Sequence, residues 1–416
     1  MHVLLAVQWV VFHMGLLISL SISLGVVLGL SQSEIGTLMQ LSFFITGVAS
    51  MVQLRWGHKV LSIEGPGAPW MAAYIIVAGV GFSMGKPASL ILTDISGAMI
   101  ISGVCMALLG ALGFVKKAQH YFTPRVTGVL LMLLGIQIGG VAVKGLVGSG
   151  LLQFLIGISI LFFVMYLLFN TKGVIKNSAI LIGFAVGWIA CIFAGVASLP
   201  DFNYSGLVNI PQLFPWGYPT YDLGTALSLL LLGFFMIPIM VGSIAAVGKV
   251  MEEEEVARKY DPGLVFSGLA NFGAGVLGGH GTVPYAVSAG LIAVTGNKER
   301  RPFFLGALLF VFMGILGPLG VLVGSIPPVI VNSMLLIPAV SLLDIGIKSI
   351  VQKEIGPKDS YIIGLSLLAG LGVMMLPMEL LQDIPSWLAT VVGNGVIVGA
   401  FVAILLEIFR ERKGGV

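Results

Sequence analysis

The sequence predicts an all-α, polytopic membrane protein with 14 spans, arranged as two inverted repeats of seven spans with short extended breaks in spans 3 and 10. Three observations carry this prediction. The 416 residues are 57% hydrophobic and only 9% charged, with a mean hydropathy of +1.07. The basic residues sort to one side of the predicted spans. Two segments rich in Gly and Pro interrupt apolar runs at corresponding places.

The composition excludes a water-soluble fold. A soluble domain carries about 25% charged residues, so this chain must use the lipid bilayer as its solvent. The net charge of +3 gives no reason to expect a nucleic-acid partner. Cys105 and Cys191 both fall in apolar runs and are interpreted as small buried side chains rather than a disulfide framework. No cofactor, metal site or nucleophile–base pair is expected, so the chain is not predicted to be an enzyme.

Apolar runs of spanning length can be counted along the whole chain. A helix needs about 20 apolar residues to cross the hydrocarbon core, and Gly, Pro and charged residues separate the runs. The predicted spans are roughly 3–30, 34–54, 60–83, 94–113, 124–143, 150–170, 178–197, 223–248, 262–278, 280–296, 302–323, 327–347, 360–377 and 387–408.

The distribution of basic residues tests this count, because cytoplasmic loops carry an excess of Lys and Arg. With the N-terminus in the cytoplasm, all but two of the 21 basic residues fall in inside loops; the exceptions are Lys86 and Lys144. A wrong count would scramble this sorting. We therefore expect a protein of the plasma membrane with both termini in the cytoplasm.

Two long connections have a distinctive composition. The charged stretch 249–261 includes four consecutive Glu residues and is interpreted as a solvated cytoplasmic loop, with a metal site as the weaker alternative. The segment 201–222 carries Pro211, Pro215 and Pro219 and is the longest predicted outer connection. We expect it to link the repeats and to cover the surface between them.

Seven spans precede this outer segment and seven follow it, so the two halves must have opposite topology. A repeated spacing supports the pairing of the halves. Pro124 opens the fifth span and Lys144 closes it, 20 residues later; Pro328 opens the twelfth span and Lys348 closes it, also 20 residues later. The alternative is a chance match in a chain of low complexity.

The two interrupted spans indicate a transport site. The third reads IEGPGAPW over 63–70, and the tenth reads GHGTVPY over 279–285. Gly and Pro deprive a helix of regular hydrogen bonds, and paired interruptions in the two halves point to the substrate site of a transporter. Each break would leave a half-helix N-terminus near the midplane, with free N–H groups and a positive dipole end. Such donors suit a ligand with carbonyl oxygens or a negative charge.

Five segments resemble motifs of one transporter family, in order and at matching spans. They are AVQWV at 6–10, IGTLMQ at 35–40, EGPGA at 64–68, FTPRVTG at 122–128 and SIPPV at 325–329. On these segments the chain resembles the nucleobase–ascorbate transporter family, which includes xanthine and uracil permeases. Trp9 stands where the family usually has His.

The resemblance implies a fold and an activity. The chain would be a single transporter unit, with a core domain over 1–120 and 223–323, a gate domain over 121–200 and 324–410, and the linker 201–222. Its activity would be secondary active transport of a purine or pyrimidine base, commonly with a proton, by movement of the core against the gate. A homodimer through the gate is also implied.

The sequence departs from the family where its substrate-binding acids usually lie. In the eighth span Ala245 stands in the place of Glu, and in the tenth Val287 stands in the place of Glu or Gln. Ser288 replaces the usual Asn, whereas Gly290 and Thr295 fit the pattern. Recognition of a base by two carboxyl side chains therefore cannot be transferred to this chain.

The candidate substrate-binding residues lie at the breaks and at these family positions. Aromatic rings next to each break could stack on a planar base, although core packing is an equal alternative. Small residues and backbone groups would provide the remaining contacts. The candidates are Gly67, Ala68, Trp70, Ala245, Val283, Tyr285, Val287 and Ser288.

Two ionisable residues are candidates for proton coupling, because a charged group kept at midplane depth indicates function. Glu64 precedes the first break; its alternative role is to cap free N–H groups or to reach the cytoplasmic interface. His280 opens the second break, and imidazole titrates near neutral pH; its alternative is an outward-facing loop residue. His13 is a core residue or a contact. Asp344 and Lys348 share a helix face and are expected to form an interfacial ion pair.

Two other functions remain open. A small-anion carrier of the related sulfate-transporter group would use the half-helix N-termini, and the absence of two carboxylates removes repulsion. An uncoupled channel would share the same spans. Saturable uptake with counterflow distinguishes a carrier from a channel.

Overall fold

The computed structural model describes residues 2–118, 123–198, 206–352, 354–377, 380 and 384–413. Up to the outer segment the chain forms nine helices and one short strand within these residues. They are α1 (His2–Val27), α2 (Gln32–Arg55), β1 (Glu64–Pro66), α3 (Ala68–Ser83), α4 (Ala88–Ala111), α5 (Phe114–Ala118), α6 (Pro124–Val147), α7 (Leu151–Asn170), α8 (Gly173–Asn177) and α9 (Ala179–Phe193).

After the outer segment the described chain is again helical with one short strand. The elements are α10 (Leu223–Val250), the 3₁₀ turn η3 (Val256–Lys259), α11 (Tyr260–Leu277), β2 (Thr282–Pro284), α12 (Ser288–Thr295), α13 (Arg300–Ile315), α14 (Gly317–Gly324), α15 (Pro328–Ile350), α16 (Pro357–Met374), α17 (Ser386–Val392) and α18 (Gly395–Lys413).

Several of these helices are membrane spans by length and composition. In the described part of the chain, seven are long and apolar enough to cross a membrane: α1, α2, α4, α6, α7, α10 and α15. The shorter helices α3 and α9 are also apolar. Large apolar side chains are exposed on the outer helices, among them Phe162 and Phe169 on α7 and Leu368 on α16. Such a surface suits lipid rather than water, so the protein is a multi-pass membrane protein.

The predicted interruptions lie where the sequence placed them. The third predicted span begins as β1 and continues as α3, and the tenth begins as β2 and continues as α12. Pro124 and Pro328 both lie in the first turn of their helices, α6 and α15, and Lys144 and Lys348 lie in the last turns. The positions of these residues in α6 and α15 confirm that the stretches 124–144 and 328–348 form corresponding helices. Lys348 also donates to Asp344 at 2.7 Å, which confirms that predicted ion pair.

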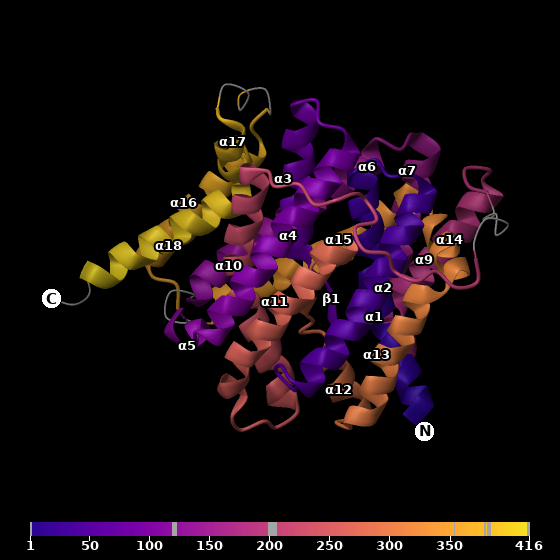
Figure 1. Cartoon of the computed structure of the whole chain (residues 1–416), viewed down its shortest axis with the longest axis horizontal. Coiled ribbons are helices and arrows are strands. Elements are labelled where there is room, and N and C mark those ends of the chain that lie inside the picture. Colours follow the sequence, from indigo (N-terminus) through magenta and orange to yellow (C-terminus); the bar gives the residue numbers. More distant parts are fainter. Residues whose placement is uncertain are drawn as a thin grey trace.

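Helices from the two halves of the chain pack against each other in matching pairs. α2 packs against α13, and α4 packs against α11. In addition, α1 packs on α13 as α10 packs on α4. Outside this group, α6 packs along α15, and the pair α7–α9 matches the pair α16–α18. Figure 1 shows β1 in the interior of the bundle, between helices of both halves.

Glycines allow the close approach of α4 and α11. A Cβ on Gly103 would lie 2.3 Å from the backbone N of Phe272, and a Cβ on Gly268 would lie 2.3 Å from that of Ala107. Small residues at a helix interface bring backbones together where no hydrophobic effect drives association. The two helices therefore form a tight antiparallel pair next to β2.

The described part of the outer segment, residues 206–222, crosses the ends of three helices. The N–H of Asn209 donates to the carbonyl of Ile315 at the end of α13, and the N–H of Phe214 donates to that of Val276 in α11. The N–H of Thr220 donates to the carbonyl of Thr93 in α4. Residues 201–205 of the predicted connection lie outside the described residues.

We expect Gly268→Ala to lower the unfolding free energy by about 1–3 kcal/mol, the usual cost of overpacking. The added methyl would meet the backbone of α4, which cannot move aside as a flexible side chain can. Thermal unfolding of the purified protein in detergent measures the effect. Gly273→Ala is the matched control, because a Cβ there meets nothing within 4 Å. Equal unfolding temperatures for the two variants would contradict close packing at Gly268.

Candidate functional site

The two breaks meet each other and form a small antiparallel ladder. Glu64 lies opposite Pro284, Gly65 opposite Val283 and Pro66 opposite Thr282. Two further hydrogen bonds extend the ladder: the N–H of Gly67 donates to the carbonyl of Gly281 at 2.8 Å, and the N–H of Tyr285 to that of Ile63 at 2.9 Å. We call residues 63–67 and 281–285 the crossing. Backbone groups that leave a helix inside a membrane must find partners within the protein, and each break supplies them to the other.

Glycine is required in the crossing because aromatic rings press against the backbone. A Cβ on Gly65 would lie 2.5 Å from the ring of Tyr285, and one on Gly281 would lie 2.7 Å from the ring of Trp70. Both rings also donate hydrogen bonds to crossing carbonyls. Trp70 Nε1 donates to the carbonyl of Thr282 at 3.3 Å, and Tyr285 Oη donates to that of Pro66 at 2.8 Å. The two aromatic residues therefore hold the crossing in shape.

A helix N-terminus begins on each side of the crossing. α3 starts at Ala68 with Pro69 in its first turn, and α12 starts at Ser288. Among the described residues, the N–H groups of Ala68, Trp70 and Val287 donate to no backbone or side-chain acceptor. Helix N-termini carry free donors and a partial positive charge. Free donors therefore remain mainly at α3. At the start of α12 the N–H groups of Ser288, Ala289 and Gly290 donate to the carbonyls of Tyr285, Ala286 and Val287, so Val287 alone keeps a free N–H there.

The partly exposed surface near these N-termini is small and apolar. Val287 is 37% exposed, and Ala68 and Ala245 are partly exposed. Ala245 lies on α10, which packs against both β2 and α12. These three positions carry no charge. Val283 and Ser288 are buried, and Gly67 caps α3 within the ladder.

His13 links α1 to the crossing. Its Nδ1 lies 2.8 Å from the carbonyl of Trp9, and its Nε2 lies 2.9 Å from Ser288 Oγ. Because a carbonyl only accepts, Nδ1 carries the proton, and Nε2 accepts from the Ser288 hydroxyl. Ser288 Oγ in turn accepts from the N–H of Ile63 at 3.2 Å. The His13 ring also stacks on Tyr285, with ring centroids 6.0 Å apart. This chain of bonds ties α1, β1 and α12 together.

Glu64 has a partner that the sequence did not reveal. Its Oε1 lies 3.0 Å from Nε2 of His58, and both side chains are fully buried. His58 follows a turn at the end of α2, where Lys59 adopts a positive φ of 59°. Arg-Trp-Gly-His-Lys reads as an ordinary cytoplasmic loop. The only sequence signal for His58 is its distance of six residues from Glu64. That distance does not indicate a contact unless the chain is known to fold back between the two residues.

His280 lies inside the protein rather than at an outward loop. It is fully buried, and its ring packs edge-on against Tyr74 with centroids 5.3 Å apart. Its Nδ1 donates to the carbonyl of Gly281 at 3.0 Å, while Nε2 has no partner among the described residues. The expected alternative, an outward-facing His280, is therefore wrong. Its role in proton coupling stays a prediction.

A cavity opens one helical turn from Ala245 along α10. It holds about 210 Å³ and is lined mainly by α10, α6 and α15. Pro238 interrupts the regular bonding of α10 at this level. The side chains around the cavity are uncharged: Val115, Pro124, Thr127, Ile237, Pro238, Val241, Gly242 and Ser349.

Comparison with known proteins shows to which family the chain belongs. A family profile described as the permease family, that of xanthine and uracil permeases, matches residues 1–379. The chain belongs to the xanthine/uracil permease family. This result confirms the resemblance seen in the sequence motifs, and a family of transporters confirms that the chain is not an enzyme.

Several relatives match nearly the whole permease. YwdJ from Bacillus subtilis, whose name describes a purine permease, is 27% identical and covers 99% of this chain and 97% of its own. The uric acid permease PucK of Bacillus subtilis is 24% identical over 94% of this chain and 90% of its own. The xanthine permease XanP of Escherichia coli is 24% identical over 93% and 87%.

Solved structures show the same fold at low identity. The transmembrane domain of the cyanobacterial bicarbonate transporter BicA superposes with a TM-score of 0.67 at 13% identity, covering 97% of this chain and 96% of that one. SLC26A9 gives a TM-score of 0.66 at 10% identity, covering 98% and 65%. At these identities the likeness concerns the fold alone, a fold of the family built from inverted repeats of seven spans.

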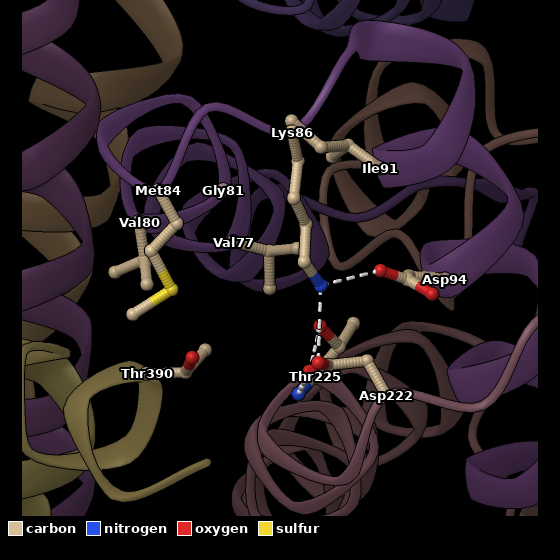
Figure 2. A pocket seen from close by; sticks show the side chains of 10 residues that line it. All are labelled: Val77, Val80, Gly81, Met84, Lys86, Ile91, Asp94, Asp222, Thr225 and Thr390. Carbon is tan, nitrogen blue, oxygen red and sulfur yellow. Dashed lines mark hydrogen bonds and ion pairs between the residues drawn. The ribbon is translucent and has the colours of Figure 1, made fainter. Parts of the chain in front are cut away.

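Figure 2 shows a charged cluster around Lys86. Lys86 Nζ donates to Asp94 Oδ2 at 2.8 Å and to Asp222 Oδ2 at 3.0 Å. It thereby joins the α3–α4 connection, α4 and the N-terminus of α10. Thr220 also donates to Asp94. The hollow beside Lys86 has about 10 Å³ of space, too little for more than one water. It is a structural joint rather than a ligand site.

The pKa values of Lys86 and Asp222 in this joint are shifted. Burial alone would lower the pKa of Lys86, but the hydrogen bonds and charges of Asp94 and Asp222 outweigh it and raise that pKa. Burial alone would raise the pKa of Asp222, but its bonds to Thr225 and Lys86 outweigh it and lower that pKa. Lys86 and Asp222 are therefore both charged across the neutral range.

We expect Lys86→Met to lower the unfolding free energy by about 1 kcal/mol at pH 7, because it leaves two carboxylates without their cation. The contribution of Lys86 is complete below about pH 10, its unfolded pKa, and that of Asp222 is complete above about pH 4. The loss of unfolding free energy in Lys86→Met should therefore be constant between about pH 4 and pH 10, and it should become smaller below about pH 4. Thermal unfolding across pH measures it, with Lys144→Met as the control. A loss that grows on acidification would contradict this charge state.

Proposed function

We propose that the protein is a secondary active transporter of a nucleobase, a purine or pyrimidine of the uracil or xanthine type or a similar small planar solute, with its substrate at the crossing. The observation that carries this proposal is the crossing itself, where two spans leave helical bonding beside the free N–H groups of Ala68 and Trp70 in the first turn of α3 and that of Val287 just before α12. The names of the relatives, which describe purine, uric acid and xanthine permeases, agree with it.

The proposed site suits a neutral, planar ligand. Nucleobases carry ring carbonyl oxygens, which accept hydrogen bonds from helix N-termini. Small residues leave room for a flat ring, while the aromatic residues fix the backbone that donates. The proposed contacts are Gly67, Ala68, Trp70, Ala245, Val283, Tyr285, Val287 and Ser288.

An uncharged surface also argues against an anion as the main substrate. None of the residues proposed for the site is Lys or Arg, so an anion would be held by helix N-termini alone. The likeness to BicA and SLC26A9 extends to the fold, and these two proteins are described as a bicarbonate transporter and an anion transporter. Anion carriage is therefore an outcome of the test below.

The proposed mechanism is alternating access by two domains of a 14-span, inverted-repeat protein. The core comprises 1–120 and 223–323, the gate comprises 121–200 and 324–410, and 201–222 links the repeats on the outside. The matching helix pairs support this division, since β1 and β2 both lie among α1–α4 and α10–α13. The cavity beside Pro238 lies between α10 of the core and α6 and α15 of the gate, where relative movement would open a path.

The membrane placement and coupling are part of the same proposal. The sorting of basic residues supports cytoplasmic termini in the plasma membrane. The exposed apolar faces of the gate helices are where a homodimer would form. A co-transported proton would supply about 2.3 kcal/mol per 100 mV, enough for roughly fifty-fold accumulation. The crossing offers Glu64 and His280 as groups that could carry it.

A ligand screen tests the substrate class. Purified protein is heated with uracil, xanthine, uric acid, ascorbate, bicarbonate or sulfate. We expect a nucleobase to stabilise the protein; a ligand at 100 times its Kd adds about 2.7 kcal/mol. Stabilisation by bicarbonate or sulfate alone would overturn the nucleobase proposal in favour of an anion carrier. In liposomes, uptake that saturates and shows counterflow supports a carrier, and unsaturated flux contradicts it.

Ala245→Leu tests the position of the site. The larger side chain would occupy the space beside β2 and α12, so we expect nucleobase binding at least about tenfold weaker, or 1.4 kcal/mol. Ala293→Leu makes the same change at an exposed position on α12 and should bind as the unaltered protein does. Titration calorimetry compares the three proteins. Unchanged affinity in Ala245→Leu would place the ligand elsewhere.

A further inference from the structure

The closed crossing contains a buried acid that is not part of the apolar ligand-facing surface. Glu64 is 0% exposed, and so is its partner His58. Glu64 Oε1 accepts a hydrogen bond from His58 Nε2 at 3.0 Å. Glu64 Oε2 is buried without a hydrogen-bond partner among the described residues. One oxygen of the carboxyl group is therefore satisfied and the other is not.

The hydrogen bonds of His58 determine which of the pair can change charge. The N–H of Val60 donates to His58 Nδ1 at 3.2 Å, so Nδ1 is an acceptor and carries no proton. Nε2 must then carry the ring proton, which it donates to Glu64. A neutral imidazole has only one such proton. Within this arrangement His58 stays neutral, and the proton that can be gained or lost belongs to Glu64.

Burial strongly favours the protonated acid while the crossing is closed. A carboxylate there would have one donor for two oxygens and no cation beside it. Burying an unpaired charge costs several kcal/mol, whereas a neutral polar group costs far less. The closed geometry is thus suited to Glu64 with its proton, and a deprotonated Glu64 needs contact with water.

The surrounding elements hold the pair but do not compensate a charge. On α2, Ser50 Oγ accepts from the N–H of Glu64 at 2.9 Å, and Gln53 Oε1 accepts from the N–H of His58 at 3.1 Å. Gln53 Nε2 in turn donates to the carbonyl of Gly263 on α11. This neutral network fixes the backbone of both residues from two helices.

Among the described residues, the other titratable groups of the elements packed around the pair form no hydrogen bond or ion pair with it. His13 of α1 bonds to Trp9 and Ser288, and Tyr285 after β2 donates to Pro66. Asp261 at the start of α11 accepts from the N–H of Val115. Tyr260 beside it is buried. Arg55 and Lys59, on the chain leading into β1, are exposed and bond to neither member of the pair.

A short segment separates Glu64 from the side where basic residues gather. Residues 56–63 connect α2 to β1, and their ends differ in exposure: Lys59 is exposed, whereas Val60 to Ile63 are buried. The N–H of Leu61 lies 3.3 Å from the sulfur of Met251, just after α10. Ser62 Oγ also donates to the carbonyl of Tyr285 at 3.2 Å. Water from that side would reach Glu64 only when this segment moves and these contacts open.

We infer that Glu64 is the proton-binding group of the transport cycle and that His58 is the residue that positions it. Glu64 takes a proton from water when the crossing is open to one side, crosses the closed state as a neutral acid, and returns the proton to water on the other side. This role rests on the proposed transport function. It provides a titrating acid in a chain that has Ala245 and Val287 at the family's acidic positions.

The first experiment compares transport by variants reconstituted in liposomes. Glu64→Gln resembles the protonated acid permanently, so we expect nucleobase counterflow to persist while accumulation driven by a pH gradient is lost. Glu254→Gln, on the neighbouring exposed loop, is the matched control and should accumulate normally. Gradient-driven accumulation retained by Glu64→Gln would overturn the inference.

The second comparison tests the positioning role. His58→Ala removes the only donor to the Glu64 carboxylate among the described residues. The pH of half-maximal uptake should therefore rise by at least about one unit, a tenfold change in proton concentration. His58→Gln can donate from a similar position and should restore the original pH profile. A residue that only supported the fold would lower uptake equally at every pH, and that result would contradict positioning.

A third measurement separates this inference from the substrate assignment. Infrared spectra of the purified protein without ligand should contain the carbonyl stretch of a protonated carboxylic acid, absent in Glu64→Gln and retained in Glu254→Gln. If no nucleobase binds but the band is present, the substrate class is wrong and the acid assignment stands. If nucleobases bind and the band is unchanged in Glu64→Gln, the acid assignment is wrong.

Discussion

The ladder between β1 and β2 is the interaction on which the rest of the structure depends. Two stretches of backbone leave helical bonding inside a membrane, where lipid offers no donors or acceptors. The bonds from Gly67 to Gly281 and from Tyr285 to Ile63 satisfy them. Because one strand comes from each half of the chain, both halves must supply the helices around the ladder. The pairs α2–α13 and α4–α11 meet this requirement.

Sequence reasoning located this ladder but not its side-chain contacts. Gly and Pro act on their own backbone, so the breaks at 63–70 and 279–285 could be read locally, as could Pro124 and Pro328 at helix starts. The membrane itself also simplified the prediction, because apolar length and basic residues are both local signals. These signals predicted a polytopic helical protein, and the five segments that resemble family motifs predicted the family to which it belongs.

The side-chain contacts that the sequence did not predict are of two kinds. Some join residues far apart in the sequence, and one, between His58 and Glu64, forms only because the chain turns back after α2. The bonds from Ser288 to His13 and to Ile63 need three elements to meet. Span helices that are apolar on every side have no polar stripe to show which face packs inward. The sequence therefore identified Glu64 but could not identify His58, and it left His280 with an outward-facing alternative that the fold excludes. Electrostatic partners in a membrane core follow from the tertiary structure.

In the proposed mechanism, the positions of Glu64, Ala245 and Val287 would separate ligand contact from the titrating charge. Val287 is partly exposed just before α12, whereas Glu64 is fully buried against α2. A carboxylate at the exposed position would meet the ligand directly, and its protonation would alter ligand affinity by direct contact. In the proposed cycle, an acid within the ladder would act instead on the crossing itself, because a charged carboxylate there would need contact with water. Binding of the proton and binding of a neutral ligand would then be coupled because both depend on the conformation of the crossing. The proton and the ligand would not need to be in contact.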